Sequence, residues 1–148
     1  MTDKIAIKGT ARAILTHDDG RVEVIEDHNM IMNGGFDLLI GSLIKSSDRP
    51  NPLTHIAIGT GSTATAATQT ALVSETYRKA GTWSWNSGSK TFTITASWSR
   101  GQVTGTIKEG AVFNASSGGT MFDRIVFSTP FTGASDIQYT QQFEFEVA

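Results

Sequence analysis

The alternation of apolar and polar residues over the eleven positions 137–147 constrains the fold of this chain more than any other feature. A period of two residues predicts a β-strand with one face toward a core and the other toward water. A strand of this kind needs neighbouring strands and a second apolar layer before it is stable. Gln141 is the one break in the pattern. One face carries Ile137, Tyr139, Phe143, Phe145 and Val147, and the other carries Gln138, Thr140, Gln142, Glu144 and Glu146.

Further segments have strand character and are separated by turn residues. Asp18-Asp19-Gly20 joins two alternating runs, 4–15 and 21–25, into a predicted hairpin, with Gly9 interpreted as a bulge. A two-residue turn at Ser87-Gly88 would place Trp83 opposite Phe92. The other predicted strands are 55–58, a stretch from 72 towards 85, 91–98, 103–113 and 121–128.

One amphipathic helix is predicted near residues 34–45. Its apolar residues recur at the spacing of a single helical stripe. Asn33 is a suitable N-cap, Asp37 favours the positive end of the helix dipole, and the segment 46–52 with its two prolines ends the helix. We expect this helix to cover an open side or end of a sheet. The stripe consists of Phe36, Leu39, Ile40, Leu43 and Ile44.

Many strands with one helix predict a mainly β protein, an antiparallel β-sandwich of jelly-roll-like kind. The chain has 148 residues, of which 39% are hydrophobic, which is enough for one core. We therefore expect a single domain over 1–148, with room for a short N-terminal arm.

Composition argues against several classes of function. The chain has no cysteine, so disulfide and thiolate chemistry are excluded. The formal net charge is −2 and the basic residues are scattered, whereas nucleic-acid binders concentrate positive charge. No apolar run approaches the ~20 residues that span a bilayer, and the first residues do not read as a signal peptide. We expect no direct nucleic-acid or membrane partner, and we expect the protein to be made and folded in the cytoplasm.

No catalytic, cofactor or metal constellation stands out. His17, His28 and His55 lie in different elements without metal-pair spacing. The stretch Gly59-Thr60-Gly61 lacks the Lys of a phosphate loop and is interpreted as a sharp exit from a strand. Glu144 and Glu146 could form a glycosidase pair, but their position favours a solvent-facing strand side. The expected catalytic, cofactor and metal residues are therefore none.

Two stretches are more specific than their composition. Residues 54–61 read Thr-His-Ile-Ala-Ile-Gly-Thr-Gly and are followed by 69–78, Gln-Thr-Ala-Leu-Val-Ser-Glu-Thr-Tyr-Arg. Residues 107–114 read Ile-Lys-Glu-Gly-Ala-Val-Phe-Asn, followed by Gly-Gly-Thr-Met-Phe-Asp-Arg at 118–124. In this order they resemble the particle-attaching N-terminal part of tail-collar fibre proteins, and related small virion proteins, of tailed bacteriophages.

The resemblance implies a structural protein of the phage particle. It departs from the family in the order Gly110-Ala111 and in stopping at Ala148, where a fibre would continue into a shaft. The missing shaft suits a stand-alone module, either a capsid decoration (cement) protein or a tail, neck or baseplate accessory protein, rather than a fibre-attachment module. Of these we favour capsid decoration. Glu75 and Arg78 could pair with each other or with Arg124 and Glu109. The structural or interface candidates are Glu75, Arg78, Trp83, Trp85, Trp98, Glu109 and Arg124.

We therefore expect a non-enzymatic, homo-oligomeric virion protein that binds capsid or tail subunits and stabilises the assembled particle. A rival hypothesis is a carbohydrate- or receptor-binding module that uses the tryptophans and the loop 114–120. A second rival is an enzyme that uses Glu144 and Glu146.

Overall fold

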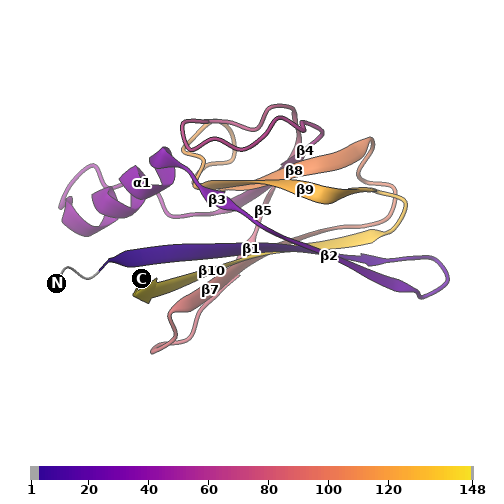
Figure 1. The fold of residues 1–148 in the computed structure, drawn as a ribbon, viewed down its shortest axis with the longest axis horizontal. Coiled ribbons are helices and arrows are strands. Elements are labelled where there is room, and N and C mark those ends of the chain that lie inside the picture. Colours follow the sequence, from indigo (N-terminus) through magenta and orange to yellow (C-terminus); the bar gives the residue numbers. More distant parts are fainter. Residues whose placement is uncertain (1–3, 148) are drawn as a thin grey trace.

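A computed structural model describes residues 4–147 and shows two antiparallel five-stranded sheets packed face to face, with one helix at one end (Figure 1). The first sheet has the order β2-β1-β10-β7-β6 and the second β3-β9-β8-β4-β5. The bounds are β1 Ile5–Thr16, β2 Val22–His28, β3 Met30–Ile31, α1 Asn33–Ile44, β4 His55–Gly59, β5 Glu75–Ala80, β6 Thr82–Ser84, β7 Thr91–Trp98, β8 Thr106–Phe113, β9 Asp123–Thr132 and β10 Asp136–Val147.

The predicted antiparallel sandwich is confirmed. Its connections are more local than those of a jelly roll, because β1–β2, β6–β7 and β8–β9 are each hairpins within one sheet. The central strand of the first sheet is β10, the segment with the clearest alternation, which pairs with β1 along its whole length. Its apolar face meets the second sheet in a core that includes Tyr139, Phe143, Phe127 and Ile125.

Both lateral edges of the sandwich are closed by strands that pass from one sheet to the other. The segment β2–β3 pairs first with β1 and then, beyond Asn29, with β9. The segment β5–β6 pairs with β4 and then, beyond Gly81, with β7. A Cβ atom at Gly81 would lie 2.5 Å from Ile94, so this corner requires glycine. Corners of this kind leave few free strand edges for pairing with another chain.

Helix α1 begins one residue before the predicted range, and its capping differs from the prediction. Met32 occupies the N-cap position without a side-chain cap, and Asn33 is the first helical residue. The backbone N–H of Asn33 is satisfied by the carbonyl of Ala67 instead. Asp37 lies beyond the first turn, so the expected interaction with the helix dipole is absent.

The expectation that α1 covers the sheets with its apolar stripe is wrong. The buried residues of α1 are Gly35 and Gly41, while Leu43 and Ile44 are 77% and 75% exposed. Glycine allows the helix to approach the carbonyl of Phe122 and the ring of Pro50 closely. The helix is thus fixed by its glycine side, and most of its large apolar side chains are left in solvent.

Two smaller expectations are also corrected. β1 pairs with β10 in continuous register through Gly9, so no bulge occurs there. Gly9 is needed because a Cβ atom would overlap the side chain of Asn29. Trp83 lies opposite Ile94 rather than Phe92, because the turn closes from Ser89 N to Asn86 O while Ser84 pairs with Thr93, which leaves two extra residues on the β7 side. Phe92 stacks instead on Phe143 of β10 at 5.1 Å.

Candidate interaction surface and the buried networks that frame it

A fully buried ion pair joins Glu109 of β8 to Arg124 of β9, with Nε to Oε1 at 3.0 Å. The same carboxylate accepts backbone N–H groups from Gly61, Val73 and Ser74 at 2.7–2.9 Å. Burying a carboxylate is costly unless it is paired and hydrogen-bonded, and Glu109 satisfies both conditions. Strands β8 and β9 therefore fasten the 60–74 loop to the second sheet.

Arg124 holds the same loop from a second direction. Its Nη1 donates to the carbonyl of Thr63 at 2.7 Å and to Oε1 of Gln69 at 3.2 Å. A Cβ atom at Gly61 would lie 2.4 Å from the Glu109 carboxylate. The glycines of residues 54–61 thus let the backbone approach the buried carboxylate of Glu109. This contact physically links that stretch to residues 107–114, which contain Glu109.

A second buried polar group lies between the sheets around Asp123 of β9. Its Oδ1 accepts the backbone N–H of Val112 at 2.9 Å, and its Oδ2 accepts Nδ2 of Asn29 at 2.5 Å. Burial raises the pKa of Asp123 to about 7, and these two hydrogen bonds oppose that rise only in part. Asp123 therefore changes charge near neutral pH inside the sandwich.

Gln141, the one break in the alternation of β10, faces this acid. When Asp123 is ionised, the Gln141 amide can donate to the carboxylate while its oxygen accepts from Tyr139 Oη at 2.8 Å. When Asp123 is protonated, the carboxyl can donate to the amide oxygen while Nε2 donates to the tyrosine oxygen at 2.8 Å. A buried amide suits this position because it can serve both protonation states. Burial raises the pKa of the Tyr139 hydroxyl well above its usual value.

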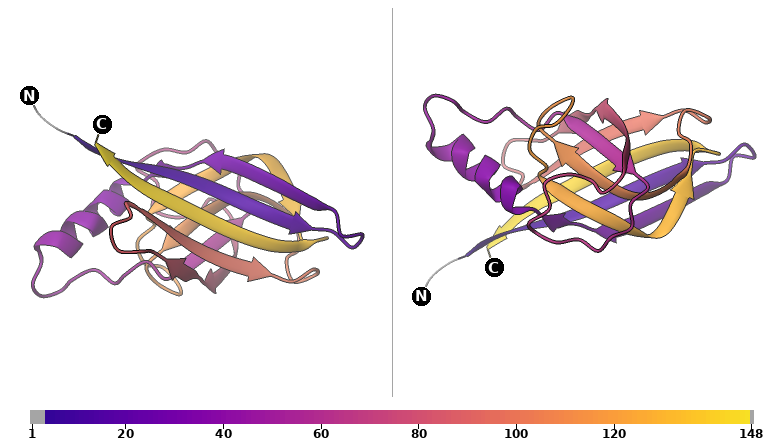
Figure 2. Two further views of the ribbon diagram at one scale, coloured as in Figure 1. Left: turned by 90° about the horizontal axis from the view of Figure 1, so that it is seen from below. Right: turned by 90° about the horizontal axis from the view of Figure 1, so that it is seen from above.

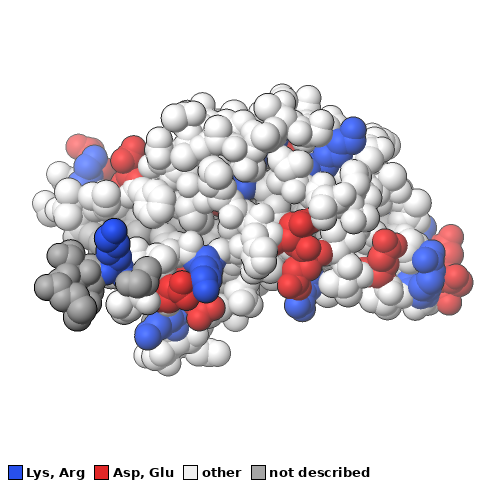
Figure 3. Space-filling model, in the orientation of Figure 1, with Lys and Arg blue, Asp and Glu red and all other residues white. Residues whose placement is uncertain are grey.

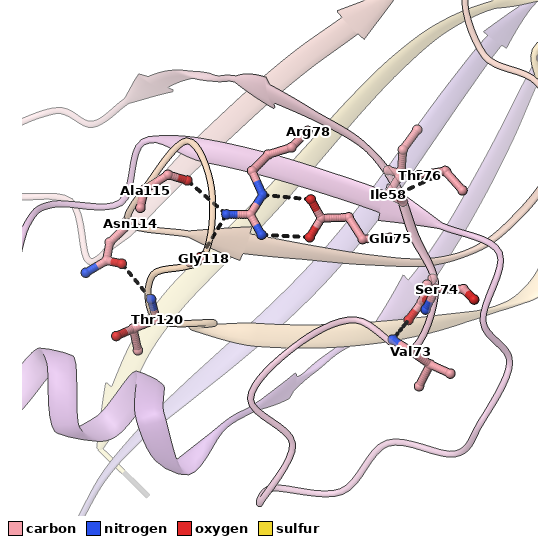
Figure 4. Close-up of polar contacts among 11 residues, drawn as sticks. Ile58, Val73, Ser74, Glu75, Thr76, Arg78, Asn114, Ala115, Gly118 and Thr120 are labelled. Carbon is pink, nitrogen blue, oxygen red and sulfur yellow. Dashed lines mark hydrogen bonds and ion pairs between the residues drawn. The ribbon is translucent and has the colours of Figure 1, made fainter.

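Glu75 and Arg78 of β5 pair with each other, through a two-pronged contact at 2.9 and 2.7 Å (Figure 4). Nη1 of Arg78 also donates to the carbonyls of Ala115 and Gly118, and its guanidinium lies 3.7 Å from the centre of the Phe113 ring. The loop 114–120 is therefore tied to β5. The two open pairings resolve as Glu75 with Arg78 and Glu109 with Arg124.

The three tryptophans do not form one platform. Trp98 is 6% exposed and belongs to the core. Trp83 and Trp85 are exposed on the β6–β7 hairpin, and Nε1 of Trp85 donates to the carbonyl of Ser89 at 2.9 Å. Trp98, Glu109 and Arg124 thus serve the interior, whereas Trp83 and Trp85 are available to a partner.

A row of contacting side chains that resembles a nucleophilic triad is formed by Ser135, His17 and Glu23. Oγ of Ser135 is 2.6 Å from Nδ1 of His17, whose Nε2 is 3.2 Å from the carboxylate of Glu23. A nucleophilic serine must be reached by its substrate, and Ser135 is 2% exposed in the turn before β10. We interpret the three residues as a tie between the β1–β2 hairpin and this turn.

The two carboxylates considered as a glycosidase pair face solvent or an ion-pair partner. Glu144 is exposed on the outer face of β10, and Glu146 pairs with Lys8 at 3.2 Å. Among residues 4–147, no three side chains of His, Asp or Glu group closely enough to hold a metal ion. None of the helical structure in the same range is long and apolar enough to cross a membrane.

The inner face of the first sheet continues beyond the part that the second sheet covers. Along β10, exposure rises from the fully buried Phe143 through the partly buried Phe145 to Val147, which is 68% exposed. Along β1, it rises from the fully buried Ala11 to Ile5, which is 76% exposed. By alternation, Ile5 and Val147 lie on the core face of their strands, yet the second sheet does not cover them.

Helix α1, both described chain ends and the β6–β7 hairpin lie at this same end of the molecule (Figures 1 and 2). We call this region the apolar end. It holds eight of the twelve exposed large hydrophobic residues in the described range. Such clustering is typical of contact surfaces, because a monomer rarely exposes a large contiguous apolar patch. The eight are Ile5, Phe36, Ile40, Leu43, Ile44, Trp83, Trp85 and Val147.

Charged side chains do not gather on the face shown in Figure 3. They occur there in small separate groups of both signs, with wide uncharged surface between them. Several are already paired within the chain, as Arg12 is with Glu26 and Lys8 with Glu146. The most distinctive feature of the surface is therefore apolar rather than electrostatic.

Sequence reasoning identified the apolar stripe of α1 but assigned it to the interior. It missed Asn29, Asp123 and the contact between His17 and Ser135, for which the sequence carries no spacing signal. Gln141 did carry one, since a polar residue on an apolar strand face indicates a buried partner.

Comparison of the chain with protein-family models, with curated proteins and with solved structures finds no match.

Proposed function

We propose that this protein is a structural subunit of a tailed-bacteriophage particle that binds neighbouring subunits through its apolar end. The observation that carries the proposal is the gathering of eight exposed large hydrophobic residues at one end of a closed sandwich. Such a cluster is costly in water and is stabilised when another protein covers it.

The phage assignment rests on the resemblance of residues 54–78 and 107–124 to particle-attaching virion proteins. The ion pair of Glu109 with Arg124 gives those stretches a physical role, since it fixes the 60–74 loop of the first stretch to the strands of the second. Within this assignment we favour capsid decoration over a role in the tail, neck or baseplate. The mechanism is mass action: a subunit that binds the assembled shell and not its free parts stabilises the assembly.

The test compares purified particles made with and without this protein, by subunit composition, electron microscopy and heat resistance. We expect the wild-type chain in fixed proportion to a shell or tail protein, and a lower disruption temperature when it is missing. A Leu43→Ser, Ile44→Ser double variant should fold but fail to join the particle. Unchanged composition and heat resistance without the protein would contradict the proposal.

A second candidate is a carbohydrate- or receptor-binding module, favoured by the exposure of Trp83 and Trp85 on one hairpin. Aromatic rings exposed in this way can stack on apolar faces of a ligand. Glycan-array binding by the wild-type protein that Trp85→Ala abolishes would support this alternative. Binding that is absent, or equal in both proteins, would count against it.

A further inference from the structure

We propose that the apolar end binds a second copy of this chain, with α1 of each copy packed on the uncovered inner face of the other copy's first sheet. The inference rests on the proposed function in one respect, since it names the partner of the same surface. The apolar end contains two exposed apolar elements, the stripe of α1 and the end of the inner face of the first sheet. Within a single chain these two elements do not pack on each other.

The lack of cover within one copy is shown by exposure. Phe36, Ile40, Leu43 and Ile44 on α1 are all exposed, and so are Ile5 and Val147 on the sheet. If α1 lay on its own sheet, both sets would be buried. A helix stripe and an apolar sheet face are the two layers that protein domains commonly pack together.

The helix is longer than the uncovered sheet face is wide. The 12 residues of α1 form a helix about 18 Å long. At this end the first sheet narrows to β1 and β10, because β7 pairs with β10 only as far as Glu144 and β6 pairs only with residues 93–95 of β7; two paired strands lie about 5 Å apart. The strand β2 does not reach this end, because it pairs only with residues 10–16 of β1. One helix therefore has the length needed to cross the uncovered face.

Reciprocal packing about a twofold axis covers both elements in both copies with one symmetric interface. Eight large side chains that are each between 43% and 77% exposed present on the order of 800 Å² per copy, which is about what one partner contributes to a standard stable interface. The surface is therefore large enough for a dimer.

The test uses single cysteines in a chain that has none of its own. Leu43→Cys reports the helix and Ile5→Cys the sheet face; an equimolar mixture of the two single variants is treated with a short bismaleimide and separated on a denaturing gel. We expect covalent dimer in the mixture at least tenfold above the level in either variant alone. Val24→Cys, an exposed valine on the distant β1–β2 hairpin, replaces Ile5→Cys in the matched control and should give only background.

Dimer formed equally by Leu43→Cys alone would overturn the helix-on-sheet arrangement, and so would equal cross-linking in the control mixture. The proposed function fails separately. If the native protein is a monomer but the Leu43→Ser, Ile44→Ser variant is lost from particles, the second-copy inference falls and the assembly role stands. If the native protein cross-links as expected but particles do not contain it, the assembly role falls and the dimer stands.

Discussion

Two regions of this protein contrast sharply: the buried polar network around Glu109 and the exposed apolar end. At Glu109, the carboxylate meets one guanidinium and three backbone N–H groups. At the apolar end, Leu43, Ile44, Ile5 and Val147 are mostly in solvent although their spacing is that of core residues.

This contrast separates residues that build the fold from residues that are left for a partner. A buried charge with all its carboxylate oxygens bonded is a structural element, however much it looks like an active-site group. A core-like stripe that is exposed is a different signal, because the fold gains nothing from leaving it in water. The predictions below test this separation, beginning with the largest expected effect.

Arg124→Met should lower the free energy of unfolding by about 3–5 kcal/mol, because it leaves the Glu109 carboxylate buried without its cation. The measurement is urea denaturation followed by tryptophan fluorescence. Arg12→Met is the matched control, since the pair of Arg12 with Glu26 is exposed and should be worth about 1 kcal/mol or less. Equal losses in the two variants would show that the buried network is not the stronger element.

Asp123→Asn should remove a pH dependence of stability. The pKa of Asp123 is raised from 3.8 to about 7 in the folded protein, so the folded state binds its proton more tightly than the unfolded state. The resulting stabilisation is fully present below about pH 4 and is lost as the pH rises through about 7, by up to about 4 kcal/mol.

The measurement is the urea midpoint of wild type and Asp123→Asn at pH 5 and pH 8. We expect the urea midpoint of the variant, relative to that of the wild type, to be higher at pH 8 than at pH 5, because the asparagine cannot ionise. A difference between the two proteins that does not change with pH would contradict the raised pKa of Asp123.

The contrast between the two regions also explains what could be predicted from sequence. Alternation identified β10 and the sandwich because burial of one strand face follows directly from the period. The stripe of α1 has the same clarity, but periodicity reports that a face is apolar and not what covers it. The burial of α1 was decided instead by Gly35 and Gly41, which the sequence does not mark as contact positions.

The buried polar network could be predicted from sequence only in part. The residue types of Glu75, Arg78, Glu109 and Arg124 suggested pairing, and register and burial then decided which pairs form. Asp123 and Asn29 are 94 positions apart and meet because the β2–β3 segment passes from the first sheet to the second at Asn29. Such a meeting depends on tertiary structure, which local spacing does not contain.

Arg78→Lys should have a smaller effect, a loss of about 1–2 kcal/mol, because lysine cannot keep the two-pronged contact with Glu75 and also bond the carbonyls of Ala115 and Gly118. Hydrogen exchange read by mass spectrometry should show faster exchange in residues 114–120. Unchanged exchange in that loop would mean that Arg78 does not hold it.

The Leu43→Ser, Ile44→Ser double variant should have the smallest effect on folding, less than about 0.5 kcal/mol for each substitution, because both side chains are exposed. Stability is measured by urea denaturation at a protein concentration low enough for the wild type to be monomeric. A loss of several kcal/mol there would mean that the helix stripe stabilises the single chain after all.

The mass of the native protein in solution, measured by sedimentation equilibrium over a wide concentration range, tests most directly whether the apolar end is a contact surface between copies. We expect the wild type to rise with concentration from the 15.9 kDa of one chain to twice that value and then to level off. The Leu43→Ser, Ile44→Ser variant should remain at the mass of one chain over the same range. A wild-type protein that stays monomeric at every concentration, or a variant that dimerises as well as the wild type, would contradict the account.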